Sequence, residues 1–218
     1  TGVQITGITV EARITSPYTV EVNDRVLTTR SIIIATGASP FVPPIPGLKE
    51  AGYLTSDTLW ELRERPKRLV VLGGGPIGAE MTQAFARLGC QVTQVEMASR
   101  ILIREDPEVS VLIRERFEAE GVRVLTDHAA KQVVIDNGEK ILLCEHQGSL
   151  VRIPFDQIIV AVGRKPHVKG FGLEELDVRI SERGTVEADP FLRTSIPTIL
   201  CAGDVAGHGD VGELRAGL

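Results

Sequence analysis

A chain of 218 residues that is 43% hydrophobic and 24% charged is long enough to bury one sizeable core or two modest ones. Its formal net charge of −5 gives no electrostatic reason to expect nucleic acid or an anionic membrane as a partner, because both need a basic face. Apolar runs such as residues 32–35 and 158–162 are far shorter than the roughly 18 residues typical of a membrane span, and they predict buried strands instead.

The first forty residues predict a small antiparallel meander followed by a buried strand. Three segments alternate apolar and polar residues, at 8–14, 18–22 and 26–29. The dipeptides between them, Ser16-Pro17 and Asn23-Asp24, suit tight turns. Residues 32–34 are continuously apolar and lead into Ala35-Thr36-Gly37, the pattern of a strand buried on both faces. The prolines of residues 40–47 exclude a helix there and predict an extended linker between domains.

The central part of the chain predicts alternating strands and helices. Ser56 is placed to cap a short helix that begins at Asp57. A buried strand, a helix and a second strand follow, at 69–72, 76–88 and 91–95. Pro107 opens a further helix, which Gly121 ends. We expect the two longer helices to face the core with Ile77, Met81, Ala84, Phe85 and Leu88, and with Val109, Leu112, Ile113 and Phe117.

Short alternating strands return after residue 122. They are broken at Asn137-Gly138 and Gln147-Gly148, and they precede an apolar strand at 158–162 that Gly163 ends. A last buried strand at 198–201 closes on Ala202-Gly203-Asp204. The whole pattern predicts an α/β fold, with a Rossmann-like parallel sheet, covering helices and an antiparallel β-meander.

Residues 73–78 match the GxGxxG pattern directly between an apolar strand and an amphipathic helix. The first glycine permits the tight turn, the second lets the backbone approach a pyrophosphate, and the third lets the helix pack closely. The following helix N-terminus attracts phosphate. The segment therefore predicts a dinucleotide-binding βαβ unit for a nicotinamide cofactor. Its candidate ligands are Gly73, Gly74, Gly75, Pro76, Ile77 and Gly78.

Glu96 ends the second strand of this unit, near the spacing expected for the acid that binds the adenosine ribose. A carboxylate there accepts hydrogen bonds from ribose hydroxyls and repels a 2′-phosphate, which favours NAD over NADP. Arg100 and Arg104 lie close in sequence and are able to turn toward such a phosphate, so NADP stays open.

Cys90, Cys144 and Cys201 form no CxxC or CxxxxC pair and are too few for a disulfide framework. We expect them to be small core residues, in a reducing, cytoplasmic compartment. No cluster in the sequence predicts a metal site. Because the chain starts at Thr1 without a leader, directly in strand-like sequence, we expect it to be a fragment of a longer protein.

Several spaced motifs carry a resemblance to one family. In chain order they are Ala35-Thr36-Gly37-Ala38, FVPPIPGL at 41–48, GGGPIGAE at 73–80, AVGRKP at 161–166 and Ala202-Gly203-Asp204. The chain resembles the FAD-dependent pyridine nucleotide-disulfide oxidoreductases over about residues 8–207, with dihydrolipoyl dehydrogenase and mercuric reductase as the nearest members. The resemblance implies that 1–47 is the later part of the first FAD-domain segment, 48–165 the NAD(P)-binding domain, and 166–218 the start of the second FAD-domain segment.

The same resemblance implies roles for residues outside the glycine loop. Glu80 would lie near the nicotinamide ring, although a helix-dipole or surface role is the alternative. Gly163 and the segment around Ala129 match positions that contact the nicotinamide ribose and the adenosine half. The expected FAD contacts are Thr36, Gly37, Ser56, Gly203 and Asp204. A helix cap explains Ser56 equally well, and a loop acid is the alternative for Asp204.

The resemblance implies an enzyme that passes a hydride from NAD(P)H to flavin and then electrons to a thiol, disulfide or metal-ion acceptor. The family's CxxxxC pair, its first FAD GxGxxG motif and its C-terminal domain, through which the parent would form a homodimer, do not occur in this sequence. We therefore expect no catalytic residue in the chain and no turnover by it alone. Two alternatives stay open: a thiol-independent flavoprotein reductase or NADH oxidase, and a non-catalytic NADH-sensing module.

Overall fold

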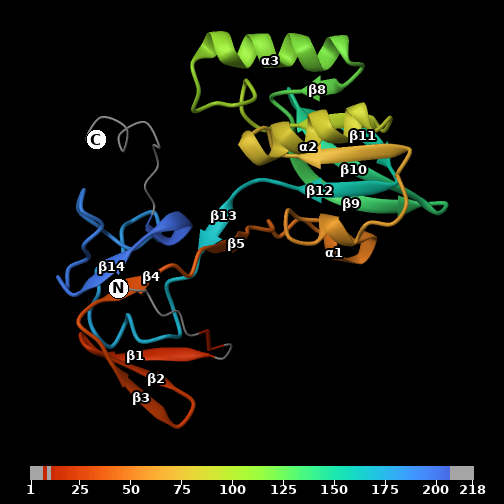
Figure 1. Cartoon of the computed structure of the whole chain (residues 1–218). Helices are drawn as coiled ribbons and strands as arrows, with labels where there is room; N and C mark the ends of the chain where they lie inside the picture. Colours follow the sequence, from red (N-terminus) through yellow and green to blue (C-terminus); the bar gives the residue numbers. More distant parts are fainter. Residues whose placement is uncertain (1–6, 9–10, 207–218) are drawn as a thin grey trace. The chain divides into compact units, whose positions relative to one another are not determined.

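The chain folds into two units, which the computed structural model (Figure 1) describes for residues 7–8 and 11–206. The inserted unit comprises Pro40–Arg164, and the flanking unit comprises the residues up to Ser39 together with those from Lys165 onward. These limits differ from the domain limits that the resemblance implies, at 47/48 and 165/166, which stay a prediction. In the part of the chain that is described, no helix is long and apolar enough to span a membrane.

A four-stranded parallel sheet forms the centre of the inserted unit. Its strands are β6 (Arg68–Leu72), β7 (Gln91–Val95), β8 (Arg123–Leu125) and β12 (Gln157–Val160), in the order β12-β6-β7-β8. Leu54 adds a parallel bridge to Ile159 at the β12 edge. The predicted α/β class with a Rossmann-like parallel sheet is therefore confirmed, and the predicted strands lie within a residue or two of their expected bounds.

Two helices cover one face of this sheet, α2 (Pro76–Arg87) and α3 (Pro107–Ala119). Each begins with a proline, whose missing N–H costs nothing in the first turn of a helix. Alternate strand residues such as Leu69 and Val71 pack against Phe85 of α2 and Phe117 of α3. The shorter helices are α1 (Leu48–Ala51) and the 3-10 turns η1 (Leu59–Glu61) and η2 (Gly203–Ala206).

The predicted core-facing stripes of both long helices were partly wrong. Phe85 and Phe117 are buried as expected, but Leu88 is 65% exposed and Leu112 is 64% exposed. Ala84 and Val109 are exposed as well. Small residues face the sheet instead, because they let the helix backbone approach it closely. The buried residues of the two helices are Gly78, Ala79, Thr82, Phe85, Ser110 and Phe117.

A three-stranded antiparallel sheet covers the other face, in the order β11-β10-β9. Its strands are β9 (Ala129–Asp136), β10 (Glu139–His146) and β11 (Ser149–Phe155). Both connecting turns are the predicted dipeptides, and both residues of each have positive φ, as type I′ hairpin turns require. Leu142 and Phe155 of this layer pack against Val70 and Val160 of the parallel sheet.

The flanking unit contains the predicted antiparallel meander, as β1 (Ala12–Ser16), β2 (Thr19–Val22) and β3 (Arg25–Thr28). The first predicted strand, 8–14, includes residues 9–10, which lie outside the described residues. A parallel pair joins β4 (Ile32–Ile34) to β14 (Ile199–Cys201). The expectation that residues 32–34 are buried on both faces was wrong, because Ile33 is 68% exposed while its two neighbours are buried. The short strands β5 (Ala38–Pro40) and β13 (Arg164–Pro166) form a two-stranded sheet where the chain passes between the units.

Ser56 does not cap a helix, contrary to one of the two roles expected for it. The turn η1 begins after Thr58, and Thr55 and Thr58 bond to each other just before it. The Ser56 hydroxyl instead donates to Asp57 and accepts from Arg164. Several neighbouring polar residues compete for the main-chain groups around position 56, and here Thr55 and Thr58 make those hydrogen bonds instead of Ser56.

Candidate cofactor-binding site

The glycine loop leaves β6 and is held by hydrogen bonds to its main chain. The N–H of Gly73 donates to the carbonyl of Val95 at 2.8 Å, and its carbonyl accepts from Nε2 of Gln94 at 3.2 Å. The N–H of Gly74 donates to Oε2 of Glu96 at 2.5 Å, and its carbonyl accepts from the N–H of Leu102 at 2.7 Å. The end of β7 and the loop after it therefore fix the first two residues of the motif.

The three motif glycines meet different surroundings. Gly73 has a φ of +115°, and a Cβ there would lie 2.3 Å from the carbonyl oxygen of Ala161. A Cβ on Gly78 would lie 2.1 Å from the carbonyl oxygen of Gly73. A Cβ on Gly75 would meet no atom within 4 Å. The fold itself requires the first and third glycines, whereas the second borders open space at the carboxyl ends of the strands, where nucleotides bind in such folds.

Three main-chain N–H groups at or near Gly75, where α2 begins, can donate to a ligand. The first helical hydrogen bond of α2 runs from Ala79 to the carbonyl of Gly75, and Pro76 has no N–H. Among the residues that the structure describes, none accepts from the N–H of Gly75, Ile77 or Gly78. These donors and the positive end of the α2 dipole form a cradle suited to an anion.

Glu96 lies half-buried at the end of β7, with both carboxylate oxygens fixed. Oε2 accepts from Gly74, and Oε1 accepts from the N–H of Ala98 at 2.7 Å. A carboxylate has about four acceptor positions, so each oxygen can still accept a hydroxyl. The carbonyl of Glu96 accepts from the N–H of His128 at 3.0 Å. Ala129, the first residue of β9, follows His128 in the sequence and so lies near Glu96 in space.

The two arginines considered for a 2′-phosphate differ. The guanidinium of Arg100 donates to the carbonyls of Glu105 at 2.9 Å and Ile103 at 3.0 Å, so it would have to break both bonds to turn toward a ligand. Arg104 is exposed.

The structure brings Gly163 near the glycine loop but leaves Glu80 apart from other charges. Gly163 has a φ of +141° and lies two residues after Ala161, whose carbonyl lies against Gly73. Its own carbonyl accepts from the N–H of Phe41 at 2.9 Å. Glu80 is exposed on the first turns of α2, and no described side chain pairs with it. The nicotinamide roles of both residues stay predictions.

The expected FAD residues fall in both units. Thr36 and Gly37 follow β4, where the Thr36 hydroxyl donates to the carbonyl of His167 at 2.7 Å. Gly203 and Asp204 follow β14, the parallel neighbour of β4, so four of the five lie at the same edge of one pair of strands. Ser56 belongs to the inserted unit, and its FAD role stays a prediction.

Sequence reasoning missed two residues that hold the glycine loop, Gln94 and Leu102. Gln94 interrupts an otherwise apolar face of β7, and this polar residue in a buried strand was a readable signal. Leu102 donates its N–H from a left-handed conformation, with φ of +50°, which Leu rarely adopts. No pattern of residue types in the sequence predicts a left-handed conformation at Leu102.

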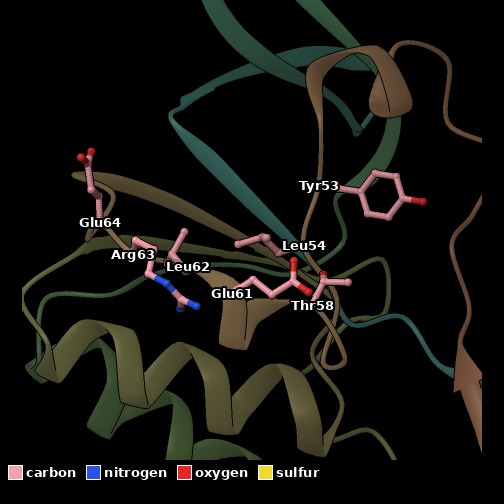
Figure 2. Close-up of a pocket in the computed structure, with 7 residues that line it drawn as sticks. All are labelled: Tyr53, Leu54, Thr58, Glu61, Leu62, Arg63 and Glu64. Atoms are coloured by element: carbon pink, nitrogen blue, oxygen red, sulfur yellow. The ribbon is translucent and has the colours of Figure 1, made fainter.

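Two surface hollows lie away from the glycine loop. One, of about 590 Å³, follows the segment between α1 and β6 (Figure 2), and its lining residues are Tyr53, Leu54, Thr58, Glu61, Leu62, Arg63 and Glu64. The other, of about 480 Å³, lies where β6 and β7 begin, beside Arg68 and Gln91. The first mixes charges of both signs, and the second lies at the amino ends of the strands, opposite to the edge at which nucleotides bind.

The cysteines are core residues, as predicted. All three are free and buried, and burial raises the pKa of each thiol, to about 11 for Cys144. A thiol that stays protonated at neutral pH is a poor nucleophile. Within the described ranges, no group of three or more His, Cys, Asp or Glu side chains is placed to hold a metal ion.

Comparison with known proteins yields one family and consistent relatives. The family model described as pyridine nucleotide-disulphide oxidoreductase matches residues 1–216. A mercuric reductase from Staphylococcus aureus is 39% identical over 195 residues, which are 89% of this chain and 36% of that protein. A dihydrolipoyl dehydrogenase from Thermus scotoductus is 39% identical over 200 residues, 89% of this chain and 43% of that protein.

A solved structure agrees with the sequence relatives. It is the Cu(II) complex of the HOCl-induced flavoprotein disulfide reductase RclA from Escherichia coli, with a TM-score of 0.81 and 31% identity. The match covers 92% of this chain and 45% of that one. The chain thus spans less than half the length of each of these three proteins.

Proposed function

The chain belongs to the pyridine nucleotide-disulphide oxidoreductase family, and on this premise we propose that its inserted unit binds NAD(H). The pyrophosphate lies at residues 73–78 and the adenosine ribose at Glu96. One observation carries the proposal: the N–H groups of Gly75, Ile77 and Gly78 have no acceptor among the described residues, and Gly75 borders open space at the N-terminus of a 12-residue helix. Such a cradle suits a diphosphate.

The hydrogen bonds that hold Glu96 support NAD over NADP as the cofactor. The N–H groups of Gly74 and Ala98 hold the Glu96 carboxylate in place, one on each oxygen. Fixed there, the carboxylate accepts the ribose hydroxyls and repels a phosphate on the same ring. Gly163 and Glu80 then face the nicotinamide half, and the segment at Ala129 faces the adenosine half.

For the parent protein we propose an FAD-dependent oxidoreductase that accepts a hydride from NAD(P)H and reduces a disulfide or a metal ion. The names of the relatives support this class of acceptor. When bound, the flavin would supply the redox chemistry that links the nicotinamide to the acceptor. In this chain Thr36, Gly37, Gly203 and Asp204 would hold it, with Ser56 beside it. We further propose a cytoplasmic homodimer that is joined through a C-terminal domain.

The test is NADH binding by the chain and by Gly75→Val, measured by isothermal titration calorimetry. Because a Cβ at Gly75 meets nothing in the fold, the variant should unfold at the same temperature as the original chain. Its side chain fills the space of the pyrophosphate, so NADH affinity should fall about 100-fold or more, which corresponds to roughly 3 kcal/mol. Gly7→Val, at another glycine with open surroundings, is the matched control and should bind NADH normally. Equal affinity of Gly75→Val and the original chain would refute the site.

A further inference from the structure

Gln94 is buried under the glycine loop, and its role there goes beyond filling the core. We propose that it is a positioning residue for the cofactor: it fixes the peptide between Gly73 and Gly74, so that the next N–H groups point at the pyrophosphate. The inference rests on the proposed function, since it concerns how the same loop is held ready. It assigns a task to a side chain that does not itself touch the nucleotide.

The burial of Gln94 makes a purely structural role a poor explanation. The side chain is 0% exposed and lies on the face of β7 that packs against α2. Its Nε2 donates to the carbonyl of Gly73, but its Oε1 has no partner among the described residues. A buried amide with an unpaired oxygen is destabilising, and an apolar side chain of similar size would fill the same place without that cost.

The geometry of the peptide shows what the bond to Gly73 achieves. In a trans peptide, the carbonyl of one residue and the N–H of the next point in opposite directions. Gln94 of β7 binds the Gly73 carbonyl, and Glu96, the residue after β7, binds the Gly74 N–H, so two side chains hold both ends of this peptide. Rotation of the peptide would break both bonds.

The following peptide shows the same arrangement with one end left open. Its carbonyl, on Gly74, accepts from the N–H of Leu102, and its N–H, on Gly75, has no partner among the residues described. That N–H therefore points away from Leu102, and the residue that carries it borders open space. Because this peptide follows the one held by Gln94, its direction depends on that first peptide being fixed.

Two substitutions that remove a buried, unpaired polar atom separate positioning from stability. Thr82 of α2 is also 0% exposed, and its hydroxyl has no partner in the described structure. Gln94→Leu and Thr82→Val both replace such a group by an apolar one of similar size. Thermal unfolding should show that Thr82→Val is no less stable than the original chain, and that Gln94→Leu, which leaves the buried Gly73 carbonyl without its donor, is at most slightly less stable. Only Gln94→Leu should bind NADH more weakly, by roughly three- to tenfold, since one hydrogen bond that orders the loop is lost.

Several outcomes would overturn the inference. Original affinity in Gln94→Leu would do so, and so would an equal loss of affinity in Thr82→Val, which would indicate a general effect of disturbing the contact between α2 and β7. If Gln94→Leu does not fold, Gln94→Met, a flexible and unbranched replacement, takes its place with the same expectations. If the original chain itself fails to bind NADH, the proposed function falls rather than this inference.

A second readout needs no cofactor. Amide hydrogen exchange followed by NMR should show that Gly74 exchanges faster in Gln94→Leu than in the original chain, because its peptide is then held at one end only. Val70 and Val71, in the middle of β6, should keep their protection in both. Unchanged exchange at Gly74 would show that Glu96 alone holds the peptide, and the role proposed for Gln94 would be wrong.

Discussion

Each unit contains a pair of parallel strands that end in glycine-containing loops, but the surroundings of these glycines differ between the units. In the inserted unit, the N–H of Ala161 after β12 donates to the carbonyl of Leu72 at 2.7 Å. In the flanking unit, the N–H of Ala202 after β14 donates to the carbonyl of Ile34 at 2.9 Å. The backbone pattern at these strand ends is thus the same in both units.

The surroundings of the two strand ends differ. Strand β6 is covered on both faces, and two glycines of its loop have carbonyl oxygens where a Cβ would go. Strand β4 leaves Ile33 exposed, and neither Gly37 nor Gly203 would bring a Cβ within 4 Å of another atom. One sequence signal, an apolar strand that ends at glycine, therefore has two physical origins: steric exclusion in the inserted unit and backbone conformation in the flanking unit.

The largest expected effect contrasts these two origins directly. Gly78→Ala places a Cβ against the Gly73 carbonyl, so the inserted unit should lose about 4 kcal/mol or more of its free energy of unfolding. Gly203→Ala meets only its positive φ of 78° and should cost roughly 1–2 kcal/mol. Urea unfolding measures the first, followed by the fluorescence of Trp60, the single tryptophan of the chain. Hydrogen exchange at β14 measures the second. Equal losses would remove the distinction between the units.

A smaller effect concerns Glu96, the acid that holds the glycine loop of the inserted unit. Glu96→Gln keeps the shape of the side chain but turns an NH₂ group toward one of the two main-chain N–H donors, at Gly74 or Ala98. NADH affinity should fall about tenfold, which is roughly 1.4 kcal/mol. NADPH affinity should fall less, because the repulsion of the 2′-phosphate is gone. Calorimetric titration with both cofactors measures the ratio, and Glu108→Gln on the exposed surface of α3 is the control. An unchanged ratio would contradict the ribose role.

The smallest effect is the pH dependence of the strand ends opposite the site. Hydrogen bonds from the Arg68 guanidinium, 2.7 Å from Asp156, lower the pKa of that carboxyl below its usual value. A lowered pKa contributes stability that is present above about pH 4 and is lost as the pH falls through the folded-state value. Because the side chains of Arg68 and Asp156 are 34% and 38% exposed, solvent screens the pair, and its contribution to the free energy of unfolding should stay below about 1 kcal/mol. Asp156→Asn should flatten the stability profile below about pH 4 in urea unfolding. A profile as steep as that of the original chain would contradict this.

Spacing and turn chemistry predicted much of the inserted unit. The glycine loop, the strand before it and the hairpin turn at Asn137-Gly138 follow from local rules, because glycine and asparagine mark backbone conformations directly. The helix faces were less predictable. Both long helices carry apolar residues on two sides, and the hydrophobic period alone does not say which side meets the sheet. Gln94 and Leu102 act through tertiary contacts with the loop, and a reading of local patterns does not contain such contacts.

The pairing of β4 with β14 has a consequence for how the chain is made. Ile32 pairs with Ile199, and the whole inserted unit is translated between them. At a synthesis rate of roughly 5–20 residues per second, β14 is synthesised about 8–30 s after β4. The inserted unit can complete its own sheet on the ribosome during that time. The flanking strand, with its apolar side chains and unpaired edge, is then the part of the nascent protein most in need of protection by chaperones.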